Sequence, residues 1–209
     1  MVKTISHATA ALIVLAGINA TFVNQASAES AKAILAGGCF WCIEKDFEHV
    51  KGVTDVISGY TGGTTPNPTY NNHTAGRHLE AVQITYDPKK ISYEKLLYIF
   101  WRTVNPTDAG GQFCDRGHSY TTAIYATSKE QSEIAKASKA ELQKSGLIKG
   151  KIVTPILSAS KFYPSEDYHQ NYYKKNPVRY KYYRYSCGRN QTVKKLWGKE
   201  AYKGVNYKT

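Results

Sequence analysis

The sequence predicts an α+β fold, a two-layer ferredoxin-like (split βαβ) sandwich with an irregular C-terminal wrap. Three observations predict it. Strand and helix patterns follow one another as strand, helix, strand, strand, helix, strand, with one more helix and strand behind them. Neither an internal repeat nor a linker divides the chain. From Ser160 onward the sequence is aromatic and basic, with one short helical candidate at 165–174.

The first elements are predicted from apolar periodicity and turn residues. Residues 31–36 form an apolar run that indicates a strand, and apolar residues then recur at helical spacing over 40–47. The segment 53–60 is rich in β-branched residues, which are typical of a strand. The polar stretch 61–77 has glycine and proline but no periodicity, so it predicts a long surface loop.

Caps and turns mark the later elements. Ser92 begins a helix, and Ser128 with Gln131 makes the capping box of another helix that Gly146 closes. The remaining strands are expected at 78–87, 120–126 and 152–159, with a glycine-rich loop at 107–118. Together these elements form one domain over residues 29–209.

The first 28 residues are expected to be a secretory signal. An apolar run from Ala8 to Ala20 follows Lys3, and Ala26-Ser27-Ala28 fits a small-residue cleavage site. The run is too short for a comfortable membrane span, so stable membrane insertion is not expected. We therefore expect cleavage after Ala28 and export, to the periplasm if the source is bacterial.

Positive charge is concentrated at the end of the chain. The formal net charge is +12, and residues 174–209 hold eleven Lys/Arg against a single acid, Glu200. Such a segment could bind nucleic acid or an anionic surface without any catalytic role. Because no nucleic-acid-binding motif accompanies the charge, we expect no nucleic-acid partner and a basic segment whose tyrosines pack on the body.

The stretch Gly-Gly-Cys-Phe-Trp-Cys at 37–42 lies where the first strand turns into the first helix. Cys39 falls at or just before the first helical residue, where free backbone N–H groups and the helix dipole stabilise an anion. A thiol there is expected to ionise more easily than an ordinary cysteine and to act as a nucleophile.

The pair Cys39 and Cys42 has three common interpretations, namely a redox pair, half of a zinc site or a haem attachment site. Haem attachment needs a histidine at the position of Ile43. Zinc would need a second close pair, which Cys114 and Cys187 do not provide, so no metal is expected. A general thiol–disulfide oxidoreductase that uses Cys39 and Cys42 remains an alternative interpretation. In such enzymes the two residues between the cysteines are usually small, whereas here both are large rings.

A candidate proton donor lies in the third predicted strand. Glu80 is surrounded by apolar residues and lies beside the long loop. A carboxyl group partly buried there would have a raised pKa and could give up a proton near neutral pH. The alternative is a solvated glutamate on the outer face of the strand.

Six motifs in one order resemble the A-type peptide methionine sulfoxide reductases. They are Gly-Cys-Phe-Trp at 38–41, Gly-Tyr-Thr-Gly-Gly at 59–63, Asn-Pro-Thr-Tyr at 67–70, His-Leu-Glu-Ala-Val at 78–82, Asp-Arg-Gly at 115–117 and Tyr-His-Gln at 168–170. The resemblance spans about 32–198. It implies reduction of the S epimer of methionine sulfoxide, free or in proteins, by a monomer with no bound cofactor. Thioredoxin or a thioredoxin-like protein is the implied reductant.

The resemblance also implies a role for each matching residue. Cys39 matches the nucleophile, and Phe40 and Trp41 match the aromatic walls around the substrate methyl group. Glu80 matches the acid that protonates the sulfoxide oxygen. The other implied substrate-binding residues are Tyr70 and Tyr120, which hydrogen-bond that oxygen, and Asp115, which lines the site.

Turnover leaves a sulfenic acid on Cys39 that a second thiol must resolve. The family usually keeps its resolving cysteine in a flexible C-terminal segment, and Cys187 occupies such a place, so Cys187 is the expected resolver. Many members have glycine at the position of Cys42, which makes Cys42 the rival. Cys114 is expected to be inert or a spare thiol.

Overall fold

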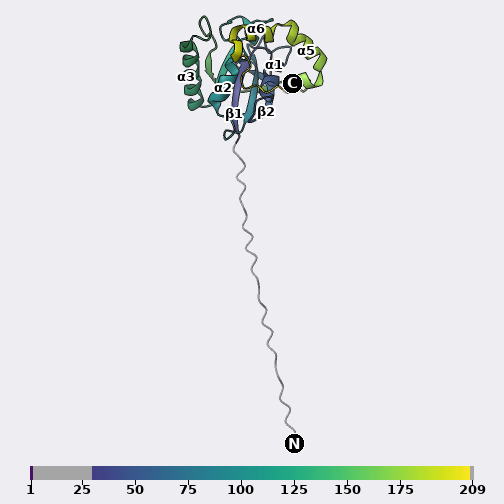
Figure 1. Ribbon diagram of the computed structural model, residues 1–209. Helices are drawn as coiled ribbons and strands as arrows, with labels where there is room; N and C mark the ends of the chain where they lie inside the picture. Colours follow the sequence, from purple (N-terminus) through teal and green to yellow (C-terminus); the bar gives the residue numbers. More distant parts are fainter. Residues whose placement is uncertain (2–29, 208–209) are drawn as a thin grey trace.

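A central sheet of six strands with helices packed against it organises the molecule (Figure 1). The computed structural model describes Met1 and residues 30–207. Across the sheet the strands are β7 (Ile156–Ser158), β6 (Thr122–Ala126), β1 (Ala31–Gly37), β3 (Leu79–Tyr86), β2 (Val53–Thr61) and β8 (Tyr163–Pro164). The predicted signal and its cleavage after Ala28 lie outside the described residues.

The sheet is mixed. β1 pairs antiparallel with both β3 and β6, and β2 pairs antiparallel with β3 and β8. β6 and β7 run parallel at one edge. The predicted mixture of strands and helices around one sheet is therefore confirmed, and the four longest strands lie within about two residues of their expected positions.

Helices border the sheet on several sides. They are α1 (Phe40–Glu48), α2 (Tyr93–Trp101), α3 (Lys129–Ser145), α4 (Tyr172–Lys175), α5 (Pro177–Ser186) and α6 (Arg189–Trp197). The labels α3 and α5 lie on opposite sides of the molecule in Figure 1. No helix among the described residues has the length and apolar character needed to cross a membrane.

Alternating strand residues divide the core between the two faces of the sheet. Val82 and Ile84 of β3 pack in the main core with the apolar faces of α1 and α2. Leu79 and Ala81 point to the other face, in a smaller cluster with Phe162 packed against it. Because side chains alternate along a strand, Glu80 faces the same side as Val82 and lies beneath α1.

The predicted helix caps are confirmed. The Ser92 hydroxyl accepts a hydrogen bond from Lys95 N at 3.2 Å at the start of α2. The Ser128 hydroxyl accepts one from Gln131 N at 3.1 Å at the start of α3, and Gly146 ends that helix in the left-handed conformation with φ 68°. Each cap satisfies a backbone group that the helix leaves unpaired.

The expected irregular wrap after Ser160 is wrong, because three helices fill much of it. α5 begins with a proline in its first turn, and Gly188, with φ 69°, separates α5 from α6. The helix expected at 165–174 is also wrong. The Gln170 side chain accepts from Ser58 N and donates to Ser58 O, so this segment is tied to β2 and α4 begins only afterwards.

Two other expectations need correction. The last strand is shorter than 152–159 and covers only β7. The glycine-rich loop at 107–118 contains a small hairpin of β4 (Gly111–Gln112) and β5 (Asp115–Arg116), followed by a 3-10 turn at His118–Tyr120. This hairpin carries Asp115 and Cys114 to the neighbourhood of α5, which the sequence pattern did not indicate.

Candidate active site

A glycine turn fixes the position of Cys39 at the start of α1. Gly38 has φ 83°, and a Cβ atom there would lie 2.6 Å from Gln112 Cβ, so only glycine fits. Cys39 is the N-cap of α1, and its carbonyl oxygen accepts a hydrogen bond from Cys42 N at 3.1 Å. The Cys39 side chain is 5% exposed.

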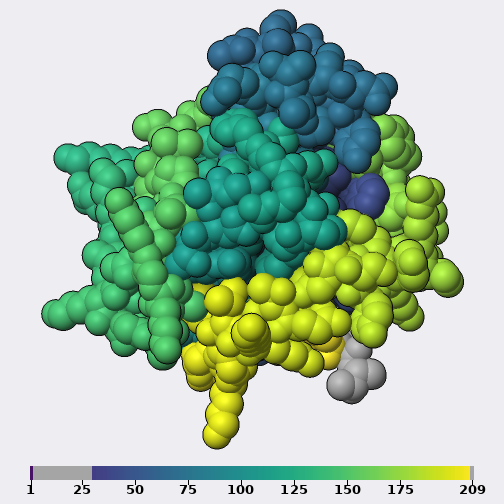
Figure 2. All heavy atoms as spheres, turned by 90° about the horizontal axis from the view of Figure 1, so that it is seen from above, coloured from purple at the N-terminus to yellow at the C-terminus, as the bar shows by residue number. Residues whose placement is uncertain are grey.

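The Cys39 side chain faces a small cavity of about 60 Å³. It is lined by Cys39, Phe40, Trp41, Tyr70, Glu80, Asp115, Tyr120 and Tyr183. Seven of these eight are residues that the sequence predicts for the site, drawn from five separate parts of the chain. Seen from above, the loop after β2 (blue), the segment around β4 and β5 (teal) and the C-terminal helices (yellow-green) surround a small dark-blue surface near the start of α1 (Figure 2).

Glu80 lies deep in this site. Its carboxyl is 2% exposed, and Oε2 accepts a hydrogen bond from Phe40 N at 3.0 Å. The same backbone segment therefore holds both Cys39 and the acid. Burial raises the Glu80 pKa to about 8, against the opposing effect of the Phe40 hydrogen bond. His73 Nε2 lies 4.0 Å from Oε1, and burial lowers the pKa of that imidazole, so it does not offset the shift at neutral pH.

The expectation that Cys39 ionises easily stays a prediction, because burial opposes ionisation of this thiol and Cys42 shares the charge. Burial raises the Cys39 pKa well above the ordinary cysteine value, and the Cys42 thiol and the Glu80 and Asp115 carboxyls raise it further. The helix N-terminus alone does not overcome this desolvation.

Cys42 shifts in the opposite direction. It is buried one turn along α1, and burial opposes its ionisation. The hydrogen bond with Cys39 and the positive charges of Arg184 and Arg189 outweigh burial and lower the Cys42 pKa to about 6. The two thiols thus form one coupled unit that holds a single negative charge readily and a second one with difficulty.

Aromatic rings build the wall of the cavity. The Trp41 ring stacks on Tyr172 with centroids 3.8 Å apart, and its Nε1 donates to His169 Nδ1 at 3.0 Å. The Phe40 ring lies 5.0 Å from the His169 ring. These contacts fix the two rings that flank Cys39, and an apolar slot between fixed rings suits a methyl group.

Tyrosine hydroxyls supply hydrogen-bond donors at the cavity. Burial raises the pKa of Tyr120 and of Tyr70, and the nearby Glu80 carboxyl raises both further, so the hydroxyls stay protonated. The Tyr183 hydroxyl donates to Asp115 Oδ2 at 2.5 Å, which links α5 to β5 across the cavity.

Sequence reasoning missed Tyr183, His169 and Glu166. His169 belongs to the Tyr-His-Gln motif, which could have indicated it. Its position in the site is known only from the hydrogen bond that Trp41 Nε1 donates to its ring. Glu166 accepts from Tyr70 N at 2.9 Å and so holds the loop that carries Tyr70. Tyr183 had no distinguishing signal in a tyrosine-rich run.

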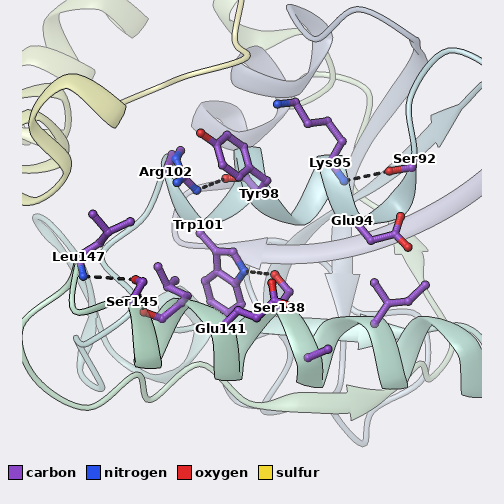
Figure 3. A pocket seen from close by; sticks show the side chains of 13 residues that line it. Ser92, Glu94, Lys95, Tyr98, Trp101, Arg102, Ser138, Glu141, Ser145 and Leu147 are labelled. Carbon is purple, nitrogen blue, oxygen red and sulfur yellow. Dashed lines mark hydrogen bonds between the residues drawn. The ribbon is translucent and has the colours of Figure 1, made fainter.

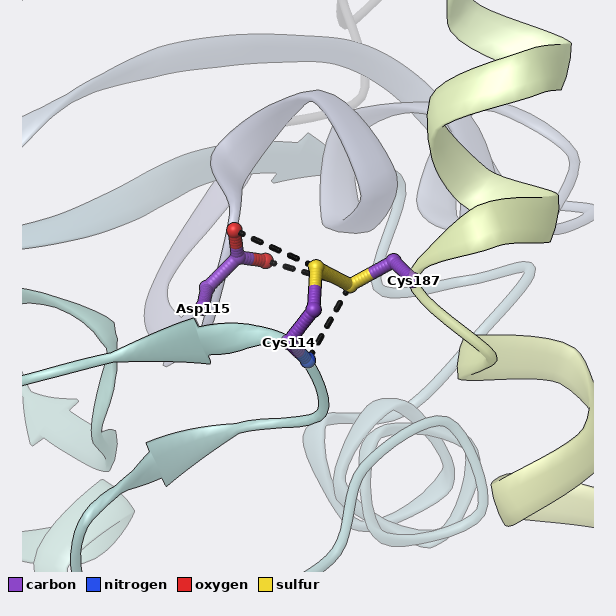
Figure 4. Close-up of side chains that lie close together, drawn as sticks. All are labelled: Cys114, Asp115 and Cys187. Atoms are coloured by element: carbon purple, nitrogen blue, oxygen red, sulfur yellow. Dashed lines mark hydrogen bonds between the residues drawn. A yellow bond between two sulfur atoms is a disulfide. The ribbon is translucent and has the colours of Figure 1, made fainter.

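Cys187 is bonded to Cys114, not to Cys39 (Figure 4). This corrects the idea of Cys114 as an inert or spare thiol, while the expected role of Cys187 as resolver during turnover stays a prediction. The two sulfur atoms each lie 3.8 Å from a carboxylate oxygen of Asp115. Although the three side chains are close enough to share a metal ion, disulfide sulfur is not a thiolate ligand, so the group does not form a metal site as it stands.

A much larger hollow lies elsewhere, between α2 and α3 (Figure 3). It has a volume of about 640 Å³, and Trp101 Nε1 donates to Ser138 Oγ at 2.9 Å at its floor. None of the predicted site residues lines it. Size therefore does not identify the site in this chain, whereas the cluster of thiol, carboxyl and phenol groups does.

Comparison with known proteins agrees with this site. The family model described as peptide methionine sulfoxide reductase matches residues 31–201. The chain is 52% identical over 181 residues to peptide methionine sulfoxide reductase MsrA 2 of Rhizobium meliloti, covering 87% of this chain and 90% of that one. It is 53% identical over 169 residues to the MsrA of Bacillus subtilis, covering 79% and 95%.

The fold is likewise similar to solved structures. Methionine sulfoxide reductase A of Corynebacterium diphtheriae superposes with a TM-score of 0.64 at 33% identity, covering 71% of this chain and 76% of that one. A reduced form of Mxr1 from Saccharomyces cerevisiae gives 0.65 at 29% identity, covering 72% and 87%. The chain therefore belongs to the peptide methionine sulfoxide reductase family, and within it to the A type.

Proposed function

We propose that this methionine sulfoxide reductase uses Cys39 as nucleophile and Glu80 as proton donor on the S epimer of methionine sulfoxide, free or in proteins. The observation that carries the assignment is the shared cavity, in which a buried thiol and a buried, protonated carboxyl flank the backbone of Phe40. Membership of the A type supports the choice of epimer.

Phe40 and Trp41 receive the substrate methyl group in this proposal. Their rings leave an apolar slot beside Cys39, while Tyr70 and Tyr120 direct hydroxyl donors into the same cavity. The methyl group and the sulfoxide oxygen are thereby held on different sides of the sulfur. Such fixed donors stabilise charge that develops on the oxygen.

Chemistry begins with attack of the Cys39 sulfur, as thiolate, on the sulfoxide sulfur. The proton of Glu80 passes to the sulfoxide oxygen, which makes the oxygen able to leave the substrate sulfur. The oxygen ends on Cys39 as a sulfenic acid, and methionine is released. Thiol and sulfoxide thus become sulfenic acid and thioether, and Glu80 is reprotonated with the proton that Cys39 gave up.

Cys42 is the thiol best placed to resolve the sulfenic acid from the state described here. It is free, buried and one helical turn from Cys39. Its sulfur attacks Cys39, a disulfide forms and water leaves. Cys187, the resolver expected from the sequence, can act only after its bond to Cys114 has been reduced. Reduction of that bond makes Cys187 the rival route.

A thioredoxin-like dithiol is the proposed external reductant, with no bound cofactor. Cys114 is exposed on the hairpin, which supports access of such a protein to the Cys114–Cys187 bond. We also propose that residues 29–209 act as a monomeric single domain after export to a periplasm. The signal-like composition of residues 1–28 supports export.

We further propose that the core is the ferredoxin-like split βαβ sandwich. In support, β6, β1, β3 and β2 are neighbours in that order, and every pair is antiparallel. α1 and α2 connect these strands and share one core with them. β7 and β8 then extend the two edges.

The test is a disulfide map after one turnover with stoichiometric methionine sulfoxide. Wild-type protein with Cys114–Cys187 intact should yield a Cys39–Cys42 bond and one methionine per chain. Cys39→Ser should yield neither, and retained activity would remove Cys39 from its role. A Cys39–Cys187 bond would favour the rival resolver, and a Cys39–Cys42 bond formed without sulfoxide would favour a general thiol–disulfide oxidoreductase.

A further inference from the structure

Arg189 is a buried cation without an acidic partner. It begins α6 and is 1% exposed. Nη1 donates to Gly37 O at 3.1 Å and Nη2 donates to Thr103 O at 3.0 Å, while Nε has no partner. Within the described part of the chain no carboxylate lies within ion-pair distance of it. A buried charge left without a counter-charge is costly, so its retention calls for an explanation.

The other buried arginines do have acidic partners. Arg184 Nη1 lies 2.8 Å from Asp46 Oδ1, and Arg102 Nε lies 3.0 Å from Glu200 Oε2. Arg189 instead has carbonyl oxygens and the ring of Phe113, whose centroid lies 4.7 Å from the guanidinium carbon. Arg189 therefore leaves a net positive charge in the interior.

This charge lies directly behind the turn that presents Cys39. A Cβ atom placed on Gly38 would be only 3.6 Å from Arg189 Nη1, and Nη1 already binds Gly37 O. At the other end of this segment, Arg184 Nη1 donates to Cys42 O at 3.4 Å. The two guanidinium groups thus flank the Cys39–Cys42 segment.

We propose that Arg189 is a positioning residue whose unpaired charge holds the negative charge of the Cys39–Cys42 thiol pair in place for the reaction. Its hydrogen bond to Gly37 at the same time fixes the turn before Cys39. The effect of Arg189 on the charge of the thiol pair does not depend on the proposed function. Its importance for catalysis does rest on that function, because a thiolate is needed for attack on the sulfoxide.

The other charged and titratable groups facing the pair do not supply an unpaired counter-charge, although the positive charge of Arg184 also lowers the Cys42 pKa. They are Lys45 and Asp46 on α1, Glu80 on β3, Asp115 on β5, and Tyr180, Tyr183 and Arg184 on α5. Asp46 and Arg184 pair with each other, and burial keeps Glu80 protonated up to about pH 8. Burial lowers the pKa of Lys45, which is only half-buried at the outer side of α1.

The first test uses the wild-type chain and no substrate. With Cys114–Cys187 oxidised, Cys39 and Cys42 are the only thiols, so the absorbance near 240 nm, after subtraction of the tyrosinate contribution measured at 295 nm, reports these two thiols. One thiolate should form with a midpoint near pH 6 in the folded protein and near the ordinary cysteine value in urea. A folded protein in which neither thiol ionises below that ordinary value would overturn the proposal.

The second test compares Arg189→Gln, which keeps N–H donors without the charge, with Arg189→Lys, which keeps the charge. Arg189→Gln should raise the midpoint by about one pH unit or more, which well below the midpoint is a loss of thiolate of about tenfold, and should slow iodoacetamide alkylation at pH 5 by about the same factor. Arg189→Lys should stay within about threefold of wild type. Arg102→Gln, another buried arginine, should leave the titration unchanged.

A purely structural role gives a different pattern. Both Arg189 variants would then lower the melting temperature while the thiolate midpoint stayed at its wild-type value, and that result would overturn the proposal. Because the titration needs no sulfoxide, it fails or succeeds separately from the assignment of Cys39 as nucleophile, which the Cys39→Ser turnover assay decides.

Discussion

At the scale of single residues, desolvation decides the chemistry of this site. In water a glutamate carboxyl is ionised at neutral pH. Burial under α1 raises the Glu80 pKa to about 8, so this carboxyl is protonated at neutral pH. The same desolvation keeps Cys39 protonated unless charge is shared with Cys42. The same buried environment therefore determines the protonation state of both the proton donor Glu80 and the nucleophile Cys39.

Replacing Glu80 with Gln should slow the reductase step by about 100-fold or more, since a positioned acid contributes on this order. Gln still offers an acceptor to Phe40 N, so the fold should persist. In the wild type the acid is lost as the pH rises through about 8, and kcat/KM should fall there. Steady-state kinetics across pH 6–10 measure both effects, and an unchanged rate in Glu80→Gln would mean another acid.

Glu44 should make stability depend on pH. It is fully buried, Oε1 accepts from Asn171 N at 2.9 Å, Oε2 has no partner, and burial raises its pKa from 4.5 to about 7. The folded state thus binds the proton more tightly, so this stability is present below pH 4.5 and is lost as the pH rises through 7.

In the wild type, Glu44 should make the free energy of unfolding fall by on the order of 2 kcal/mol between pH 5 and pH 8, and Glu44→Gln should remove this fall. Urea unfolding at pH 5, 6, 7 and 8 measures it. Glu141→Gln, at an exposed position of α3, is the matched control and should leave the slope with pH as in the wild type. Equal slopes in wild type and Glu44→Gln would show that Glu44 does not titrate in this range.

At the scale of elements, the site depends on how separate segments are joined. The turn at Gly38 joins β1 to α1, and the Cys114–Cys187 bond joins the β4–β5 hairpin to the end of α5. Each junction brings cavity residues from distant parts of the sequence together. Each can therefore be tested by a change that leaves the cavity side chains intact.

Gly38→Ala should destabilise the chain more than Gly146→Ala. Both glycines have positive φ, which costs a residue with a Cβ about 1–2 kcal/mol. At Gly146 a Cβ would meet nothing within 4 Å, whereas at Gly38 it would meet Gln112 Cβ at 2.6 Å. Urea unfolding should show a larger loss of stability in Gly38→Ala than in Gly146→Ala. Turnover assays should show a loss of activity in Gly38→Ala and none in Gly146→Ala. Equal losses would exclude the steric role of Gln112.

Breaking the disulfide should lower the free energy of unfolding by about 2–4 kcal/mol, because 73 residues separate its two ends. Cys114→Ser, Cys187→Ser and the double variant should lose the same amount, as each removes one bond. Wild-type protein unfolded in the presence of dithiothreitol provides the control. Additive losses in the double variant would show that the bond is not the source of the effect.

At the scale of the whole molecule, the eleven Lys/Arg residues of the C-terminal segment overstate the free positive charge that a partner meets there. Arg184 and Arg189 of the basic C-terminal segment are buried, and Lys174 and Lys203 pair with Glu48 and Glu200. The tyrosines divide in the same way, with Tyr180 buried and Tyr182 and Tyr185 exposed. The expected packing of tyrosines on the body is thus confirmed only in part.

Binding to duplex DNA should therefore be weak and lost in salt. Fluorescence anisotropy at 150 mM NaCl should show a dissociation constant no tighter than about 10 μM, in the range of non-specific binding. A titration at 20 mM NaCl gives the matched reference for counterion release. Tighter binding that persists at 150 mM NaCl would contradict this prediction and would identify the basic C-terminal segment as a nucleic-acid-binding surface.

Sequence reasoning reached the core because alternation along 78–87 and the Ser92 and Ser128 caps are local signals. It also named seven of the eight cavity residues. It failed where partners are distant. Disulfide connectivity cannot be deduced from spacing, so the bond between Cys114 and Cys187 was not predicted. The tyrosine-rich run concealed α5 and α6, because its aromatic and basic residues do not separate into clear faces.

The central place of β1 bears on how the chain is made. β1 is the first strand of the sheet to be synthesised, yet it lies between β3 and β6 and pairs with residues as late as 125. A chain that emerges amino end first therefore carries an apolar strand with two open edges until β3 has followed, and with one open edge until β6 has followed. Trimming of the chain beyond Ala31 would remove residues that pair with Tyr86 and Thr85 of β3, so it should destabilise the sheet.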